Sequence, residues 1–303
     1  MKSAERYLAL ILERSNVTAV ELTHSAKGYT LTAAGSLVSS LNFDDQDAFM
    51  KPGAVQRERT FAQELSVFLR RIASGSKMFS FGLNSRMVMM QTFPLDVDLA
   101  PNEVDQHAQW ELTQYFSDAN PELYFVNTQV LNSTAESHVA NAVIVAVRKP
   151  FVNFLTNVCT HLHGMLHIVD VDHFGAENAL LLSNPELHEK KVVFVGVDED
   201  SFDASILVHG SPHDIRTMER LSDTDVAMLA DFIGEAAPDS VFFHGRMVNE
   251  TLVSAVEQKI GMPIEIIDPF KRVTLPSSVK NFEEISHNKQ RYAAAIGLAL
   301  RTE

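Results

Sequence analysis

VVFVGVDEDSFDASILV, residues 192–208, is the stretch that decides the fold. Residues 192–197 are apolar, residues 198–201 are polar, and residues 202–208 alternate large and small side chains, which together predict a β-hairpin. The same succession of apolar run, polar turn and second strand occurs in residues 7–22. Two such hairpins, each opening one half of the chain, indicate a duplicated α/β fold, although chance similarity of two short hairpins would give the same pattern.

The composition is that of an ordinary globular protein, and its charge restricts the partners. The chain has 303 residues, 46% hydrophobic and 21% charged, which is enough for two domains or one domain with insertions. Its 25 Lys and Arg against 39 Asp and Glu give a formal net charge of −14. Such a surface repels nucleic-acid phosphates and anionic lipid headgroups, so we expect neither as a direct partner, whereas a basic segment of another protein would be attracted.

Cysteine usage and hydropathy bear on the compartment. The single cysteine, Cys159, cannot form an intramolecular disulfide, which fits a reducing cytoplasm. The first apolar run, residues 7–12, ends at Glu13 and Arg14 and does not read as a signal peptide, and the longest later run, residues 142–147, is too short to span a bilayer. We therefore expect a cytoplasmic protein that does not insert into a membrane and whose membrane association would come through another molecule.

The stretch between the two hairpins predicts a helix followed by a compact alternating unit. Residues 55–72 carry apolar side chains at helical spacing, and a short buried strand is expected at 78–83. From Arg86 to Val171 the chain reads strand–helix–strand–strand–helix–strand, with Asn102 as the expected cap of the first helix. This pattern predicts a small α+β subdomain with its own sheet, whose last strand is residues 165–171.

The second half is expected to be a further alternating domain that follows a polar linker at 183–191. Helices are expected at 223–237, 248–260 and 289–300, and strands at 241–244 and 264–267. The last helix carries a stripe of small residues that permits close packing: Ala293, Ala294, Ala295 and Gly297.

Four stretches resemble segments of one known family. GMPIEIIDPF (261–270) followed by YAAAIGLALR (292–301) resembles the closing segment of the type IV pilus assembly protein PilM family, a branch of the actin-like ATPase superfamily to which FtsA also belongs. LHIVDVDHFGAENAL (166–180) and LALILERSNVTAVEL (8–22) are similar to two further segments of that family. The resemblance implies an α/β fold of two RNase H-like domains with an inserted α+β subdomain of the 1C type.

The same resemblance implies the domain limits. Residues 1–83 together with 173–190 would form the first RNase H-like domain (1A), residues 84–172 the inserted subdomain, and residues 191–303 the second RNase H-like domain (2A). In the family a further subdomain, 2B, separates the second hairpin from the strand that carries the adenosine. Here only residues 210–240 are available, so we expect 2B to be reduced or missing.

The first hairpin departs from the ATP-binding pattern of the family. The family carries Asp-Ile-Gly-Ser there, in which the aspartate orients metal and water and the glycine lets backbone amides approach the phosphates. The corresponding residues here are Ile11, Leu12, Glu13 and Arg14. The aspartate is therefore lost, and a glutamate stands at the position of the glycine.

The second hairpin departs as well. In place of a further Asp-Ile-Gly, the chain reads Gly196, Val197 and Asp198, followed by Glu199 and Asp200. Three carboxylates would each repel a phosphate charge by about 1 kcal/mol in water at ~4 Å, and more strongly where water is excluded.

The third feature, a run of glycines against which adenosine lies, is reduced to Gly245, and Arg246 and Met247 carry side chains where bare backbone is required. From these departures we expect no bound nucleotide or other cofactor and no catalytic residue, which makes the chain a pseudo-ATPase.

Two groups of side chains could be interpreted as metal sites, and neither reading is favoured. Asp198, Asp200 and Asp203 resemble a cation-binding loop, but such a loop needs an oxygen ligand where Phe202 stands, so a solvated turn is favoured. Four histidines lie close to Cys159 in sequence: His161, His163, His167 and His173. Helix residues two apart point to different sides, so these groups do not converge on zinc, and Cys159 is expected in the core.

Three methionines, Met87, Met89 and Met90, could line an adaptable binding groove. Neighbouring strand residues point to opposite faces of a sheet, so Met89 and Met90 cannot both face one groove, and a place in the strand core is favoured.

The leading functional hypothesis is a non-catalytic scaffold of a type IV pilus or type II secretion-like envelope assembly. By resemblance it would bind the cytoplasmic N-terminal tail of an inner-membrane protein in a groove beside the inserted subdomain, whose residues the sequence does not assign. The net charge of −14 suits a basic tail. The alternatives are an ATP-binding switch or weak ATPase with an altered site, and a filament-forming element like FtsA.

Overall fold

A computed structural model describes residues 6–26, 28–49, 53–96, 98–116, 120–131, 139–222 and 226–301. The chain forms two compact units. Unit 1 consists of Met1–Met87, Lys149–Ser183 and Asp268–Glu303, and unit 2 consists of Val88–Arg148 and Asn184–Ile267.

Unit 1 is organised by a six-stranded sheet with the order β14-β3-β2-β1-β4-β8. Its strands are β1 (Arg6–Glu13), β2 (Asn16–Ser25), β3 (Gly28–Val38), β4 (Met78–Leu83), β8 (Met165–Val171) and β14 (Val273–Thr274). β1 to β3 form an antiparallel meander, and β4 and β8 then add in parallel. β1 lies in the interior of the sheet, so both faces of its apolar run are buried.

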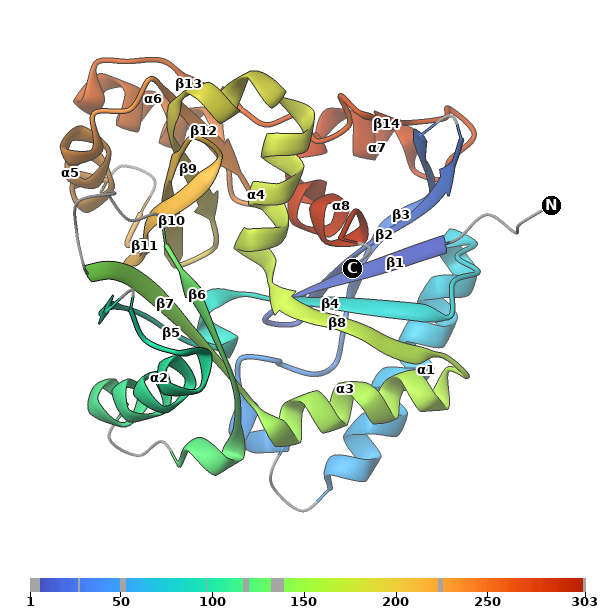
Figure 1. The fold of residues 1–303 in the computed structure, drawn as a ribbon. Coiled ribbons are helices and arrows are strands. Elements are labelled where there is room, and N and C mark those ends of the chain that lie inside the picture. Colours follow the sequence, from blue (N-terminus) through green and yellow to red (C-terminus); the bar gives the residue numbers. More distant parts are fainter. Residues whose placement is uncertain are drawn as a thin grey trace. The chain divides into compact units, whose positions relative to one another are not determined.

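Helices cover both faces of this sheet. α1 (Ala54–Ile72) and α3 (Lys149–His161) lie on one face, and α4 (Asp172–Ser183) and α8 (Ala293–Ala299) lie on the other (Figure 1). The shorter helical segments of this unit are η1 (Gln46–Phe49), η2 (Ser85–Met87), α7 (Phe282–His287) and η5 (Lys289–Tyr292). α1 and α3 supply the crossovers that parallel strands require.

The predicted close packing of the last helix is confirmed. A Cβ atom on Gly297 of α8 would overlap the carbonyl oxygen of Gly175 in α4, and a Cβ on Gly175 would lie 2.7 Å from the carbonyl oxygen of Ala294. Asn178 Nδ2 donates a hydrogen bond of 2.8 Å to the Gly297 carbonyl across the same contact. The backbones of the two helices can approach so closely only because these positions lack side chains.

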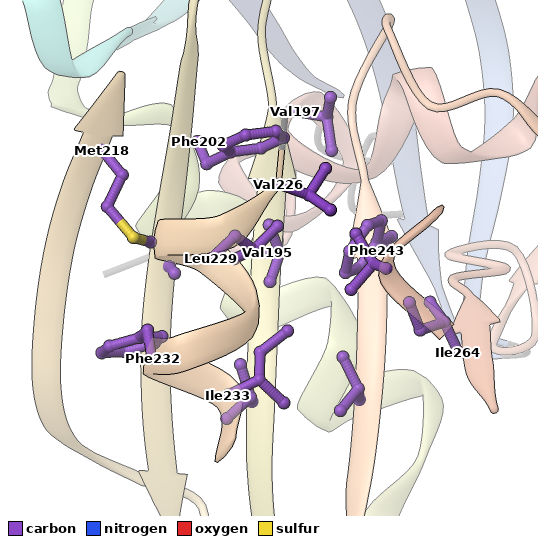
Figure 2. Packing of buried hydrophobic residues seen from close by; sticks show 14 of the residues in the cluster. Val195, Val197, Phe202, Met218, Val226, Leu229, Phe232, Ile233, Phe243 and Ile264 are labelled. Atoms are coloured by element: carbon purple, nitrogen blue, oxygen red, sulfur yellow. The ribbon is translucent and has the colours of Figure 1, made fainter. Parts of the chain in front are cut away.

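The larger sheet of unit 2 has five strands in the order β11-β10-β9-β12-β13. They are β9 (Lys191–Val197), β10 (Ser201–Val208), β11 (Ser211–Glu219), β12 (Ser240–His244) and β13 (Ile264–Ile266), with helices η4 (Pro185–Glu189), α5 (Ala227–Ala236) and α6 (Glu250–Ile260). Figure 2 shows how Leu229, Phe232 and Ile233 of α5 pack onto Val195 and Phe243 from the sheet.

The two large sheets share one topology. In unit 1 the strand order β3-β2-β1-β4-β8 corresponds to β11-β10-β9-β12-β13 in unit 2, and a helix precedes the fourth and fifth strands in each case. β1–β2 and β9–β10 occupy equivalent places in the two sheets. The duplicated α/β fold predicted from the two hairpins is therefore confirmed.

A separate three-stranded sheet in unit 2 has the order β5-β7-β6. Its strands are β5 (Met89–Asp96), β6 (Tyr124–Val130) and β7 (Val139–Arg148), and the helices of this stretch are α2 (Pro101–Tyr115) and η3 (Pro121–Leu123). Ala108 and Leu112 of α2 pack with Phe93 and Ile144 of the sheet in a small core.

The prediction that residues 165–171 close the sheet of the inserted subdomain is wrong. This strand is β8, which pairs in parallel with β4 in the six-stranded sheet. α3 packs with α1 and provides the crossover between the two strands, so the insertion is confined to the β4–α3 connection.

The predicted cap of α2 is also wrong. The helix begins at Pro101, whose fixed φ suits the first turn, and Glu103 accepts a hydrogen bond from the Ala100 N–H at 2.8 Å.

The second half differs from its prediction in two places. β11 was not predicted, because most of its residues are polar and only Ile215 and Met218 are buried. Asp268–Glu303 groups with unit 1, where α8 packs on α4 and on β1, although the sequence placed it in the second domain. The domain limits taken from the family stay a prediction.

No helix in the described part of the chain has both the length and the apolar character needed to cross a bilayer.

Candidate functional site

Ile11 and Glu13, the altered residues of the first hairpin, lie at the end of β1. The Ile11 side chain is buried and its Cδ1 fills the space beside Gly82 that a side chain there would occupy. Glu13 pairs with Asn16 across the turn. The position of the metal-orienting aspartate is therefore part of the packed interior of unit 1, and its aliphatic side chain cannot bind a cation.

The turn of the first hairpin is held by the segment that follows β3. The carbonyl oxygens of Arg14 and Ser15 accept hydrogen bonds from the N–H groups of Phe43 (2.9 Å) and Ser39 (2.7 Å). The guanidinium groups of Arg14 and Arg86 lie 3.8 and 3.9 Å from Asp44 Oδ2. Both cations at this turn are thus partly neutralised by one carboxylate.

The turn of the second hairpin is fixed by Arg220. This buried arginine donates from Nη1 to the carbonyl oxygens of Asp198 (3.0 Å) and Glu199 (2.6 Å), and its backbone N–H donates to the carbonyl of Asp200 (2.9 Å). A phosphate-binding turn works in the opposite sense, because its N–H groups converge on the anion. Here two successive carbonyl groups, those of Asp198 and Glu199, converge on a cation that belongs to the chain itself.

Of the two glycines that remain at motif positions, Gly245 is required by its own contacts. Gly196 lies inside β9, paired with Asp203 of β10 and with His244 of β12. Gly245 has φ 111°, and a Cβ atom there would lie 2.6 Å from the Val197 carbonyl oxygen. Arg246 follows as a partly buried residue. Gly245 is thus required by the contact between the ends of β9 and β12, whether or not a nucleotide binds.

No separate subdomain lies between β10 and β12 in the described residues. Between β10 and β12 they form only β11 and α5, which complete the RNase H-like pattern of unit 2. The described part of residues 210–240 therefore belongs entirely to the RNase H-like domain of unit 2.

The side chains considered as metal ligands do not gather at one site, and three of them are buried in the protein interior. Asp203 is buried and accepts a hydrogen bond from Thr217 Oγ1 at 2.7 Å. Cys159 lies in the core of unit 1, and burial raises the pKa of its thiol to about 12. His173 is buried with Nε2 3.5 Å from Glu177 Oε1, and desolvation lowers its pKa to about 3. The described residues contain no group of three His, Cys, Asp or Glu that could hold a metal ion.

A groove of about 600 Å³ in unit 2 is the best candidate for a partner site. It is lined by β5, β11 and α5, so it lies beside the three-stranded sheet of the insertion. Met90 lines it, as do Met218 and Met228, whereas Met87 is buried in unit 1 and Met89 packs on the small core of the insertion. Met90 therefore lines a groove and does not lie in the strand core that the sequence favours for it.

Within the described residues, both sheets present an unpaired edge to this groove, because β5 and β11 are each the outermost strand of their sheet. Backbone groups at the two edges are bound by neighbouring side chains. The Ile215 N–H donates to Asp214 Oδ1 at 2.9 Å, and Gln91 Nε2 donates to the Thr92 carbonyl at 3.0 Å. An added strand would offer the same kinds of donor and acceptor to these groups.

The groove is acidic. Three carboxylates, those of Asp214, Asp231 and Glu235, line it with one arginine, Arg216. Arg216 lies 3.0 Å from Asp214 and 3.8 Å from Glu235, and its guanidinium stacks 5.0 Å above the Phe232 ring. One arginine cannot neutralise three carboxylates, so the groove favours a cationic occupant.

Comparison with solved structures decides the fold. The chain matches the PilM–PilN type IV pilus biogenesis complex with a TM-score of 0.76 at 16% identity, covering 99% of both chains. The chain has a PilM-like, actin-like ATPase fold. The fold named from the sequence is therefore confirmed.

Two further solved structures match the chain at lower similarity. A Bacteroides thetaiotaomicron protein with actin-like ATPase fold and unknown function matches with a TM-score of 0.56 at 14% identity, covering 88% of this chain and 93% of that one. The cytoplasmic domain of EpsL, an inner-membrane component of the type II secretion system of Vibrio cholerae, matches with a TM-score of 0.51 at 11% identity, covering 99% and 96%. No protein-family model and no curated protein matches the sequence.

Proposed function

We propose that the chain is a non-catalytic, PilM-like scaffold of a type IV pilus or type II secretion-like envelope assembly. The observation that carries the proposal is that the residues at the family's nucleotide motifs contact other atoms of the chain itself, in a chain with a PilM-like fold. Ile11 covers Gly82, Arg220 binds the carbonyls of the second turn, and Gly245 lies against Val197. The similarity to PilM in its complex with PilN and to the EpsL cytoplasmic domain supports the choice of machine.

The proposed partner is the cytoplasmic N-terminal tail of an inner-membrane protein, bound in the groove between β5, β11 and α5. An extended segment can pair with a sheet edge through its backbone and insert alternate side chains into pockets beside it. Two edge strands, three methionines and three carboxylates favour an extended tail with both apolar and basic side chains. The net charge of −14 adds long-range attraction for such a tail.

The proposed partner also implies where in the cell the protein works. The scaffold would work in the cytoplasm and be recruited to the inner membrane by the tail it binds, as the sequence predicts. The similarity to a cytoplasmic domain of an inner-membrane component supports this placement.

Isothermal titration calorimetry tests both halves of the proposal on the full chain. MgATP is expected to give no heat of binding at micromolar concentrations, whereas a short basic peptide copied from the tail of a neighbouring single-span membrane protein is expected to bind. A scrambled peptide of the same charge is the control for sequence, and an acidic peptide is the control for charge. Micromolar binding of MgATP would overturn the non-catalytic assignment.

A second candidate, an ATP-binding switch or weak ATPase with an altered site, is favoured by one observation. Arg14 and Arg86 bring two guanidinium groups to the first hairpin turn, and a phosphate could compete with Asp44 for them. This second candidate predicts that the unaltered protein binds MgATP and that Arg14→Ala abolishes the binding. The scaffold proposal predicts that neither protein binds MgATP.

A further inference from the structure

A second pocket, of about 480 Å³, lies in unit 1 and has the opposite charge to the rest of the protein. It is formed by α1, the loop from α1 into β4, and the turn that follows α3. Arg59, Arg70, Lys77, His161 and His163 line it, and no Asp or Glu is among the described residues that do. Three permanent cations and two histidines thus gather in one pocket of a chain whose net charge is −14.

Helix ends explain only part of this cluster. Arg70 and His161 stand in the last turns of α1 and α3, where a cation is favourable beside the terminal carbonyl groups, and Lys77 Nζ donates to the Leu162 carbonyl at 3.0 Å. Arg59, in contrast, lies more than three turns before the end of α1 at Ile72. Neither Arg59 nor Arg70 has a side-chain ion pair or hydrogen bond within the described chain. Two arginines are therefore available to an anion.

The turn after α3 is held against β4. There is no space for a Cβ on Gly164, because the Phe79 ring and the Lys77 carbonyl already occupy it. The Met165 N–H donates to the same Lys77 carbonyl at 2.8 Å, and His163 adopts φ 56°. This frame fixes the rim that carries the two histidines.

The loop from α1 into β4 is held in place by hydrogen bonds to the buried carboxylate of Glu21. Its Oε2 accepts hydrogen bonds from Ser74 Oγ (2.7 Å), the Gly75 N–H (2.8 Å) and the Ser76 N–H (2.7 Å). Arg6 Nη1 lies 3.7 Å from its Oε1. The negative charge under the loop is thus satisfied by internal partners, and the pocket is formed before any ligand arrives.

We propose that this pocket binds the phosphate group of a phosphate ester. Arginine and lysine side chains bind phosphate through charge-assisted hydrogen bonds, and the fork of each arginine suits two of its oxygens. The pocket is larger than a phosphate ion, and Leu69, Phe79 and Leu162 line the remainder, which suits an organic group attached to the phosphate. A phospholipid headgroup and a free phosphorylated metabolite both present this chemistry. The repulsion of lipid headgroups expected from the net charge does not apply at this pocket, because local charge decides at contact distance.

The test compares the double variant Arg59→Ala/Arg70→Ala with the double variant Lys190→Ala/Lys259→Ala, which removes the same charge from exposed positions in unit 2. Glycerol 3-phosphate is titrated into each full-length protein, and binding is followed through the ring-proton NMR signals of His161 and His163. The unaltered protein and the lysine variant are expected to bind alike, and the arginine variant at least tenfold more weakly. An equal loss of affinity in both variants would overturn the proposal.

Vesicle sedimentation identifies the source of the phosphate. If it belongs to a lipid, the protein sediments with phosphatidylglycerol vesicles and the arginine variant does not, while phosphatidylcholine vesicles bind neither. If it belongs to a free metabolite, glycerol 3-phosphate binds and no vesicle does. Absence of binding in both assays refutes the site.

Discussion

Removing the Arg220 side chain tests whether the second hairpin is a structural turn. The guanidinium donates to two carbonyl groups, at 3.0 and 2.6 Å. Hydrogen bonds from a charged group contribute about 1.5–3 kcal/mol each, so the pair is worth about 3–6 kcal/mol before water is considered. Asp198 and Glu199 are not buried, so water recovers part of this loss. We expect Arg220→Ala to lower the free energy of unfolding by about 2–4 kcal/mol.

Urea unfolding followed by circular dichroism measures this difference, and Arg216→Ala on β11 is the matched control. Arg216 is half exposed and forms surface ion pairs, so its loss is expected to cost about 1 kcal/mol or less. Arg220→Lys, which keeps the charge but cannot reach both carbonyls with a fork, is expected to lie between the two. If Arg220→Ala costs no more than Arg216→Ala, the turn does not depend on the arginine and the argument for its structural role fails.

Three further predictions concern the carboxylates of the groove, the packing at Gly245 and the burial of His173. Asp214→Asn/Asp231→Asn is expected to weaken binding of a basic tail peptide at least tenfold in calorimetry, because it removes two of the carboxylates of the groove. Gly245→Ala is expected to destabilise the protein by about 3 kcal/mol in urea, since the new Cβ would lie 2.6 Å from the Val197 carbonyl oxygen at a positive φ. His173 is neutral in the folded protein because its pKa is lowered from 6.5 to about 3, so protons bind the unfolded chain first and stability is lost as pH falls from 6.5 towards 3. The stability–pH slope should be flatter in His173→Gln.

Each of these predictions has an outcome that contradicts it. The tail peptide should also lose affinity as salt is added, and an unchanged affinity in the double variant would move the tail away from this groove. Gly261→Ala is the control for Gly245→Ala, because Gly261 also has a positive φ (70°) but a Cβ atom there would meet no neighbouring atom within 4 Å. If both variants lose the same stability, backbone strain alone explains the loss, and the contact with Val197 contributes nothing. A pH slope that is the same with and without His173 would show that another group titrates.

The sequence predicted the parts of the fold that depend on local pattern. The two hairpins are recognisable because apolar runs and a polar turn suffice to define them, and they indicated the duplication correctly. β11 was missed because an edge strand buries few residues and its pattern is mostly polar. The partner of the 165–171 strand was misassigned because the sheet that a strand joins depends on contacts distant in sequence, which periodicity does not report.

The two pockets could not be predicted for the same reason. The groove in unit 2 depends on which strands are outermost in two different sheets, a property of the assembled topology. In the unit 1 pocket, Arg59 and His163 are brought together by the packing of α1 against α3. Motif comparison finds residues that are close in sequence, so it identified the altered hairpins and passed over both pockets.

The altered hairpins also show how a surviving motif residue should be interpreted. Gly245 matches a glycine that the family uses against adenosine, yet the backbone of Val197 would exclude a side chain there in any case. Gly82 likewise leaves room for Ile11, a residue that cannot bind a metal. A glycine kept for packing persists after a ligand is lost, so its presence is no evidence for a nucleotide. The hydrogen bonds of the second hairpin turn are more informative, because the carbonyl oxygens of Asp198 and Glu199 are directed at Arg220. A turn whose acceptors are already bound by an internal cation has a function in stability that is independent of ATP.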